Sequence, residues 1–437
     1  MKNTVLTLRE RLFSIIRGLT EEPERYARKP GRDFTRKRTL TPEVLIYLIL
    51  TMDEKSVWKG LLGHFQRRID TPSASAFVQQ RQKLLPSALE DLFHRFSDQL
   101  RPQKKFRGYR LLAVDGSSLK SGAYPADQDA YRPGTARQHG WNLFHINALF
   151  DIENCIYTDV IVQKEHTKNE SKALREMAKR SGISDPVLVL ADRNYEAYNN
   201  FVCLEKTGWK YLIRIKDSNR KNAYGIKLPD ELEFDLPVRM TLGRLTPQQL
   251  RQRDVPVPEH YYRLPNSVPF DYLDVESTDF YEFSARIIRL TLKDGRTKML
   301  ITNLDAGQFP LSAIQALYAR RWGIETSFRE LKYTVGLIHL HSRKSDLVLQ
   351  EIFAAFAVFN FTQAAAWNTN ESCGRSKYQR RVNLAHAVYL CCEVLRGKSA
   401  EITALLERAL TPCRPDRVYP RPKIFENRLS AMYVSAR

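Results

Sequence analysis

Two short apolar runs, each ending in an aspartate, restrict the folds open to this chain more than any other feature. Leu111–Val114 precedes Asp115, and Leu188–Ala191 precedes Asp192. Such aliphatic runs are typical of strands buried in a sheet. Ligand sites in α/β sheets form at strand ends, so both carboxylates are expected at the mouth of a site. Taken alone, an aspartate in this position is more often a turn former or a helix N-cap.

The segments around the two runs alternate between extended and helical patterns. Strands are expected at 110–114, 142–150, 155–162, 186–191 and 210–216, with helices at about 169–180 and 197–206. A three-strand meander followed by helix, strand, helix and strand indicates an α/β layer structure. From 217 to 303 the pattern is β-rich and includes a hairpin of strands 283–292 and 298–302.

Helical segments flank this α/β region on both sides. Residues 1 to about 102 contain short helices that open at Thr41-Pro42 and at 71–73, which resembles a helix-turn-helix arrangement. The basic run 25–38 fits a solvated linker and a DNA-contacting arm equally well. Residues 310–408 are helical, and polar residues interrupt their most apolar stretch, 349–367. A buried core helix is therefore expected there, not a membrane span.

The overall charge of the chain indicates a polyanionic partner. Lys and Arg number 69 against 49 Asp and Glu, which gives a net charge of +20. The 43% hydrophobic content excludes a largely disordered chain. Six scattered cysteines without zinc spacing indicate a reducing, intracellular compartment. Basic residues are spread through the first 19 positions, so no secretory signal peptide is expected.

Four polar residues between 317 and 332 give the most informative spacing. Tyr318, Arg321, Glu325 and Lys332 would share one stripe of a continuous helix, beside an apolar face. An ordinary amphipathic surface helix also explains this periodicity. However, Glu325 together with the two strand-end aspartates would bring three carboxylates to one cleft. Crowded carboxylates repel one another unless cations bind between them, and Mg²⁺ is the natural cation for oxygen ligands.

The same residues resemble a known family. The spacing Tyr318-x2-Arg321-x3-Glu325-x6-Lys332 is similar to the Tyr-Arg-Glu-Lys signature of bacterial insertion-sequence transposases of the DDE type. Residues 192–195 and 114–117 resemble the second-aspartate and first-aspartate motifs of that group. The resemblance spans about 111–335.

The sequence departs from the family pattern at two places. Asn194 stands where the motif usually has glycine, and asparagine tolerates positive φ, so a preserved turn is expected. Relatives stack a flipped base on a tryptophan of the insertion, but no tryptophan occurs between positions 209 and 322. Tyr281, Phe283 or Trp322 could supply the stacking face instead.

The resemblance implies an RNase H-like catalytic core, a mixed sheet flanked by helices and interrupted by a β-rich insertion. The first aspartate would lie on the first strand, the second on the fourth, and the glutamate on a later helix. The chain then divides into a helical DNA-binding region (1–102), the first part of the core (103–216), the insertion (217–303), the second part of the core (304–344), and a helical C-terminal region with a basic tail (345–437).

The implied function is cut-and-paste DNA transposition, with cleavage at transposon ends followed by strand transfer into target DNA. Asp115, Asp192 and Glu325 would be the catalytic residues and would hold two Mg²⁺ ions, for which Mn²⁺ can substitute. The residues expected to contact DNA are Tyr318, Arg321, Lys332, Arg193 and Trp322. The implied partners are double-stranded DNA, as terminal inverted repeats and target, and a second copy of the chain in the synaptic complex. A bacterial cytoplasmic location, on the nucleoid when DNA is bound, and no membrane association are expected.

Three other functions compete with this interpretation. A non-catalytic DNA-binding protein would account for the charge and the N-terminal helices but leaves the three carboxylates unexplained. A metal-dependent nuclease that does not join strands, or an inactive DNA-binding regulator of the same fold, has the same sequence features. A two-carboxylate glycosidase needs an acid with a raised pKa, and Arg321 beside Glu325 would lower that pKa.

Overall fold

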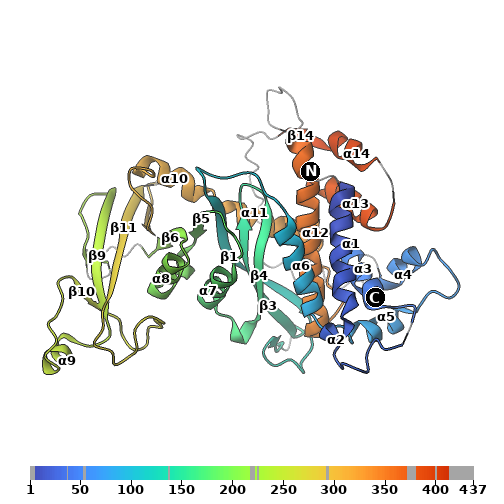
Figure 1. The fold of residues 1–437 in the computed structure, drawn as a ribbon, viewed down its shortest axis with the longest axis horizontal. Helices are drawn as coiled ribbons and strands as arrows, with labels where there is room; N and C mark the ends of the chain where they lie inside the picture. Colours follow the sequence, from blue (N-terminus) through green and yellow to red (C-terminus); the bar gives the residue numbers. More distant parts are fainter. Residues whose placement is uncertain are drawn as a thin grey trace.

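A computed structural model of the chain describes residues 5–36, 38–52, 56–135, 138–216, 222–223, 226–291, 295–371, 380–398 and 401–412. Within these residues, ten strands form one large mixed sheet in the order β10-β9-β11-β12-β6-β5-β1-β3-β2, with β4 also paired to β3. The insertion strands lie at one end of the molecule and most of the N-terminal and C-terminal helices at the other (Figure 1).

The central strands match the predicted α/β core. They are β1 (Arg110–Gly122), β2 (Tyr131–Arg132), β3 (Trp141–Asp151), β4 (Ile156–Lys164), β5 (Val187–Ala191) and β6 (Lys210–Ile215). β3 runs antiparallel to β1 and β4, whereas β1, β5 and β6 are parallel neighbours. With the two-residue β2 set aside, β1 is the first core strand and β5 the fourth. The structure therefore confirms the predicted mixed sheet flanked by helices.

Helices cover both faces of this sheet, and β1 alternates between them. The connections after β4 and β5 contain η1 (Glu165–Thr167), α7 (Glu170–Arg180), η2 (Arg193–Tyr195) and α8 (Tyr198–Lys206). Leu112 and Val114 pack into the core under α7 and α8. Ala113 packs into the core formed with the N-terminal and C-terminal helices. Since side chains alternate along a strand, Asp115 shares the face of Ala113 and Gly116 shares the face of Val114.

The N-terminal region is helical, as predicted. Its helices are α1 (Val5–Glu21), α2 (Pro23–Tyr26), α3 (Pro42–Thr51), α4 (Val57–His64), α5 (Ala74–Arg81) and α6 (Ser87–Gln99). The Thr41 and Ser73 side chains accept hydrogen bonds from Val44 N and Ala76 N, which confirms both predicted helix starts. Gln66 and Arg67, which follow α4 closely, have positive φ, a conformation that does not continue a helix.

The β-rich segment extends the central sheet. It contains β7 (Asn222–Ala223), β8 (Ile226–Lys227), β9 (Phe234–Gly243), α9 (Pro247–Gln252), β10 (Tyr261–Arg263), β11 (Tyr281–Thr291) and β12 (Thr297–Thr302). β11 and β12 form the predicted antiparallel hairpin, whose turn residues 292–294 lie outside the described residues. β12 then pairs with β6, so the segment continues the core sheet. The domain boundaries assigned from the sequence stay a prediction.

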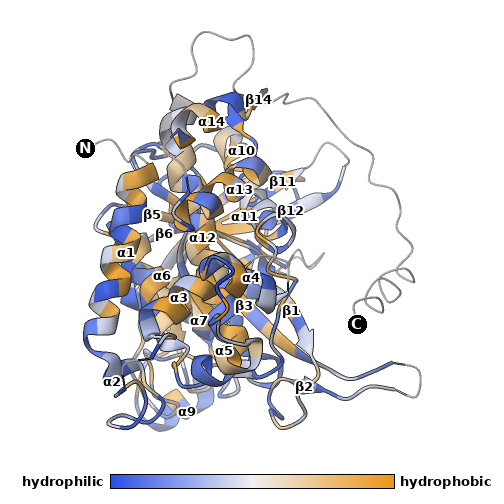
Figure 2. Cartoon of the chain, turned by 90° about the vertical axis from the view of Figure 1, so that its right-hand side faces the viewer, coloured by the Kyte–Doolittle hydropathy of each residue, from blue (hydrophilic) through white to orange (hydrophobic). Residues whose placement is uncertain are grey.

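The C-terminal part surrounds one long apolar helix. Its elements are α10 (Leu311–Ala319), α11 (Trp322–Arg329), η3 (Glu330–Thr334), α12 (Ser345–Glu371), β13 (Arg380–Val382), α13 (Leu384–Leu395), α14 (Ile402–Arg408) and β14 (Leu410–Pro412). Residues 345–367 are long and apolar enough to cross a membrane, but 83% of that stretch is buried inside the fold. Hydrophobic residues dominate the visible part of α12 (Figure 2). The tail beyond residue 412 lies outside the described residues.

Candidate active site

The two strand-end aspartates emerge at the same edge of the sheet. β1 and β5 are parallel neighbours with Ala113 opposite Leu190, so Asp115 and Asp192 each lie two positions beyond this pair. Asp115 Oδ1 accepts a hydrogen bond from Gly116 N (2.8 Å). Asp192 caps the short helix η2 by accepting a hydrogen bond from Asn194 N (2.8 Å).

The turn after Asp192 is preserved despite the missing glycine, although not through positive φ. Asn194 is absent from the described non-glycine residues with positive φ, and the chain forms the 3₁₀ turn of η2 instead. The backbone N–H of Asn194 satisfies Asp192, and the Asn194 side chain hydrogen-bonds to Glu170. Asn194 therefore links Asp192 to Glu170, in addition to fitting the turn.

Arg321 connects the first and third carboxylates. Its Nη2 donates to Glu325 Oε1 (2.6 Å), one helical turn along, and its Nη1 lies 3.5 Å from Asp115 Oδ2. Arg321 is 8% exposed, and its Nε has no hydrogen-bond partner among the described residues. The guanidinium thus stands between two carboxylates and keeps a free donor.

The charge balance at Asp115 is unfavourable to its ionised form. Burial raises the pKa of Asp115 to about 6, and the negative charges of Asp192 and Glu325 act in the same direction. The hydrogen bond from Gly116 N and the charge of Arg321 oppose this shift without cancelling it. A carboxylate with a raised pKa among other carboxylates favours the binding of additional positive charge.

The predicted continuous helix from 317 to 332 is wrong. α10 ends at Ala319, α11 begins at Trp322, and a π-helical turn follows at 330–334. The apolar face is divided accordingly, because Leu317 packs with the α10 core, whereas Ile324, Phe328 and Leu331 pack in the larger core. The 100° wheel fails across this break, although Arg321 and Glu325 remain in contact.

The break changes the environments of Tyr318 and Lys332. Tyr318 is buried, and its hydroxyl donates to Ala191 O at the end of β5 (3.3 Å). Lys332 Nζ donates to Ser117 Oγ and to Ser118 O, both at 2.8 Å, and burial lowers its pKa. Both residues therefore hold the strands that carry the aspartates.

Two of the residues predicted to contact DNA are exposed. Arg193 is exposed, and the described residues show no ion pair to it. Trp322 is 54% exposed. Of the other candidates for base stacking, Phe283 is fully buried, and Tyr281 is partly buried against Phe270, with ring centroids 5.8 Å apart. The geometry favours Trp322.

The donor set fits a hard divalent cation in its chemistry. Asp115, Asp192 and Glu325 offer carboxylate oxygens, which Mg²⁺ prefers. In the conformations described, no three His, Cys, Asp or Glu side chains are grouped closely enough to hold a metal ion. The Arg321 guanidinium lies between Asp115 and Glu325, so it would have to move before a cation could bridge them.

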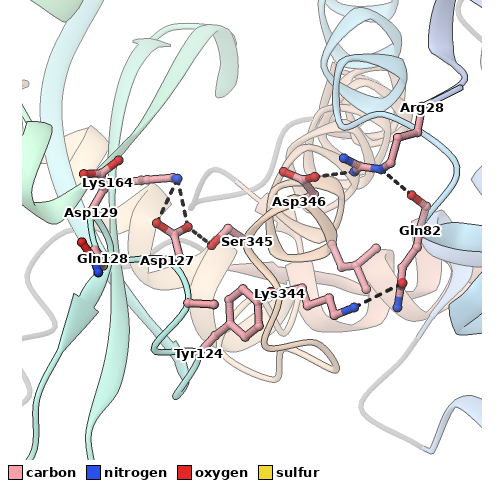
Figure 3. Close-up of a pocket in the computed structure, with 12 residues that line it drawn as sticks. Arg28, Gln82, Tyr124, Asp127, Gln128, Asp129, Lys164, Lys344, Ser345 and Asp346 are labelled. Carbon is pink, nitrogen blue, oxygen red and sulfur yellow. Dashed lines mark hydrogen bonds and ion pairs between the residues drawn. The ribbon is translucent and has the colours of Figure 1, made fainter.

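A separate cavity lies where the N-terminal helices meet the start of α12 (Figure 3). Its volume is about 650 Å³ and its lining does not include the three carboxylates. Four of its charged side chains pair with one another, since Lys164 Nζ lies 2.9 Å from Asp127 and Arg28 pairs with Asp346. We assign no chemistry to it.

Sequence reasoning missed one polar pair beside the site. No motif recognised in the sequence includes His145 or Glu170. In the structure His145 Nε2 lies 2.8 Å from Glu170 Oε1, directly against Gly116. The two residues are 25 positions apart on a strand and a helix, so no local spacing indicates their contact.

Comparison with known proteins identifies the family. The model of the transposase DDE domain matches residues 106–361, more than half of the chain. The transposase InsG for insertion sequence element IS4 of Escherichia coli (strain K12) is 24% identical over 361 residues, covering 78% of this chain and 74% of InsG. The cryo-EM structure of the piggyBac transposase synaptic complex with hairpin DNA has a TM-score of 0.47 at 12% identity, covering 93% of this chain and 82% of that one. The match to the family model over more than half of the chain shows that the chain belongs to the DDE-domain transposases, the enzymes of DNA transposition.

Proposed function

We propose that this protein is a cut-and-paste transposase that cleaves DNA at transposon ends and joins them to target DNA at Asp115, Asp192 and Glu325. The observation that carries the proposal is the pairing of Asp115 and Glu325 around Arg321, with the pKa of Asp115 raised to about 6. With three carboxylates and one guanidinium, such a cluster has an excess of negative charge, which favours the binding of a cation. Family membership supports the reaction type.

The residues divide the chemistry between them. Asp115, Asp192 and Glu325 would hold two divalent cations, Mg²⁺ or Mn²⁺, whose chemistry is to activate the attacking water or 3′-hydroxyl and to stabilise the leaving oxygen. If cations displaced the Arg321 guanidinium from the two carboxylates, it would donate to a DNA phosphate near the scissile bond. Cleavage and joining then use the same residues with different nucleophiles.

Further contacts would orient the DNA end. Arg193 and Trp322 are exposed and would meet phosphate and an unstacked base, respectively. Lys332 would add positive charge near the phosphates while it holds β1. Tyr318 was predicted to contact a phosphate, and its hydroxyl would instead fix the end of β5 in the conformation described.

The N-terminal region would provide a second DNA contact. Arg32, Arg36 and Arg38 line a hollow of about 820 Å³ beside Gln79 and Gln80. One negative side chain, Asp33, lines it as well. This concentration of positive charge supports the DNA-contacting arm over the solvated linker. Residue 37 of the basic run lies outside the described residues.

The assembly and location follow from the reaction. Two transposon ends are cut and joined together, so the active species would be a homodimer. By analogy with the family, the C-terminal helices after Ser345 would supply dimer contacts, and because most of α12 is buried within its own fold, α13 and α14 are the better candidates. We also propose that the protein acts on nucleoid DNA in the bacterial cytoplasm, and the burial of α12 supports a core role for this helix over a membrane span.

The test is cleavage of a labelled duplex carrying the inverted repeats that flank the gene. We expect Glu325→Gln to slow cleavage about 10³-fold or more, because a metal ligand contributes several kcal/mol to transition-state stabilisation. Duplex binding should persist. Glu176→Gln, an exposed carboxylate on α7, is the matched control and should cut at the wild-type rate.

Scoring cleavage and joining separately tests the alternatives. Cleavage without any joined product would identify a nuclease, and specific binding without cleavage by the wild type would identify a DNA-binding regulator.

A further inference from the structure

A buried polar pair lies against β1 on the face opposite the catalytic helix α11. His145, on β3, and Glu170, the first residue of α7, place Nε2 and Oε1 2.8 Å apart. Their side chains are 6% and 23% exposed. The mechanism proposed above uses neither residue, yet burying a charged carboxylate is costly unless it is paired. The pair therefore needs its own explanation.

The pair packs directly on the residue that follows the first aspartate. A Cβ added to Gly116 would lie 2.5 Å from His145 Nε2 and 2.7 Å from Glu170 Oε1, closer than any ordinary contact. Ser118 Oγ lies 3.5 Å from His145 Nδ1. The pair thus contacts the backbone of β1 on the face that packs under α7 and α8, and Asp115 projects from the opposite face.

Glu170 also reaches the turn that carries the second aspartate. The Asn194 side chain hydrogen-bonds to Glu170, and Asn194 N donates to Asp192 Oδ1 (2.8 Å). The contact with His145, and secondarily the one with Asn194, lowers the pKa of Glu170, so the carboxylate is charged at neutral pH. One carboxylate therefore connects both aspartate segments.

Tyr195 completes the group. Its side chain is fully buried, and its hydroxyl has no hydrogen-bond partner among the described residues. Burial, followed by the negative charges of Glu170, Asp115 and Asp192, raises its pKa well above the ordinary value. The hydroxyl therefore stays neutral and keeps an unused hydrogen-bond donor near the aspartate segments.

We propose that His145 and Glu170 are positioning residues that fix the distance between the Asp115 and Asp192 backbones, so that the two carboxylates can share cations. The inference rests on the proposed function and deepens it. The pair would support the two aspartate segments through its close contact and its packing on Gly116, as residues behind the direct ligands do in metal sites. The role of the pair also explains why asparagine stands at position 194, since glycine would have no side-chain amide to hydrogen-bond to Glu170.

The experiment compares disruptive with conservative variants in the full-length protein. His145→Leu and Glu170→Ala should each slow end cleavage about 10- to 100-fold and weaken Mn²⁺ binding to the protein–DNA complex by a similar factor, the usual cost of removing such support. The dissociation constant for the DNA end should stay within about twofold. His145→Gln, which keeps an N–H donor toward Glu170, should recover most of both losses.

Two further variants separate positioning from folding. Gly116→Ala should reproduce the loss by displacing the pair, and His145→Leu/Glu170→Ala should be no worse than the poorer single variant, because the residues act as one unit. Glu165→Gln removes the nearby Arg132–Glu165 pair (2.7 Å) and is the matched control, expected to cleave and bind Mn²⁺ normally.

The outcomes are distinct from those for the proposed function. If folded His145→Leu cleaves and binds Mn²⁺ like the wild type, or if His145→Gln loses as much as His145→Leu, the positioning role is wrong. In either case, cleavage by the wild type that depends on Glu325 keeps the proposed function intact. A wild type that neither binds Mn²⁺ nor cleaves would overturn both.

Discussion

Of the buried arginines that contact carboxylates among the described residues, Arg81 and Arg321 differ in how completely their nitrogens are hydrogen-bonded. Arg81, on α5, donates from Nε to Gln350 (2.7 Å), from Nη1 to Glu351 (2.9 Å) and from Nη2 to Leu347 O (2.6 Å). Arg321, beside α11, contacts two carboxylates and leaves Nε without a partner among the described residues. One arrangement is complete, whereas the other would have to rearrange before its remaining donor could be used.

The pKa values of the carboxylates beside the two arginines shift in opposite directions. Burial alone would raise the pKa of Glu351, but the hydrogen bonds from His341 and the charge of Arg81 outweigh it and lower that pKa. Burial raises the pKa of Asp115 to about 6, and Arg321 does not offset this. A buried ion pair is therefore structural where its hydrogen bonds are complete, and it indicates a binding site where they are not.

The largest expected effect is on stability, at the complete pair. Arg81→Met leaves the Glu351 carboxylate buried and uncompensated, which typically costs about 3–5 kcal/mol in the free energy of unfolding. Urea denaturation of the purified protein measures it. The double variant Arg81→Met/Glu351→Leu should regain most of the loss, because both charges are then absent. A loss below about 1 kcal/mol for Arg81→Met would remove the distinction between the two arginines.

Substitution of Arg321, whose hydrogen bonding is incomplete, should have the reverse result: a large effect on activity and a small effect on stability. Arg321→Met should slow cleavage about 10²- to 10³-fold, the usual cost of losing a donor to transition-state charge. Its free energy of unfolding should fall by less than that of Arg81→Met, because Glu325 is partly exposed and Asp115, whose pKa is already raised, can take up a proton when the guanidinium is lost. The same assays on both arginine variants give the comparison, and a stability loss equal to that of Arg81→Met would contradict it.

The pH dependence of stability distinguishes the two carboxylates in the metal-free protein. Because the folded pKa of Asp115 is raised from 3.8 to about 6, its contribution to stability is present below about pH 4 and is lost as the pH rises through 6. Asp115→Asn should therefore stabilise the protein at pH 7.5 by about 1–3 kcal/mol and abolish cleavage. Urea denaturation from pH 4.5 to 7.5 measures the change.

Glu351→Gln is the matched control for this pH series. The folded pKa of Glu351 is lowered, so its contribution is present above the unfolded pKa and is lost on acidification. Its removal should destabilise the protein at pH 7.5. If Asp115→Asn also destabilised the metal-free protein at that pH, the excess of negative charge at the site would be disproved.

Local patterns predicted the elements that carry the site. The runs before Asp115 and Asp192 are buried strands, and their parallel pairing brings both carboxylates to one edge. The Arg321–Glu325 contact followed from helical spacing. These features depend on residues close together in the sequence, so periodicity was sufficient to find them.

Tertiary contacts decided the features that the sequence analysis missed. The helix break before Trp322 buries Tyr318 against Ala191, 127 residues earlier, and no periodicity carries that information. The partners of Arg81 lie more than 260 residues away. The His145–Glu170 contact joins a strand and a helix entry, and its only local signal is the glycine at 116, whose close approach requires the structure to interpret.

The smallest expected effect concerns Trp322, which is exposed beside Arg321, with the Arg321 Cζ 5.9 Å from its ring centroid. If the DNA end binds beside Arg321, Trp322→Ala should remove a stacking surface that contributes about 1–3 kcal/mol of binding free energy for one base. Trp322→Phe should keep most of it. Fluorescence of 2-aminopurine placed at the transposon end reports an unstacked base and should change on binding to wild type, less so with Trp322→Ala. Phe283→Leu, fully buried in the insertion, should lower stability without altering the signal. If the signal with Trp322→Ala equalled that of the wild type, the unstacked base would not lie against Trp322. The DNA end would then not be bound on the side of Arg321 that Trp322 covers.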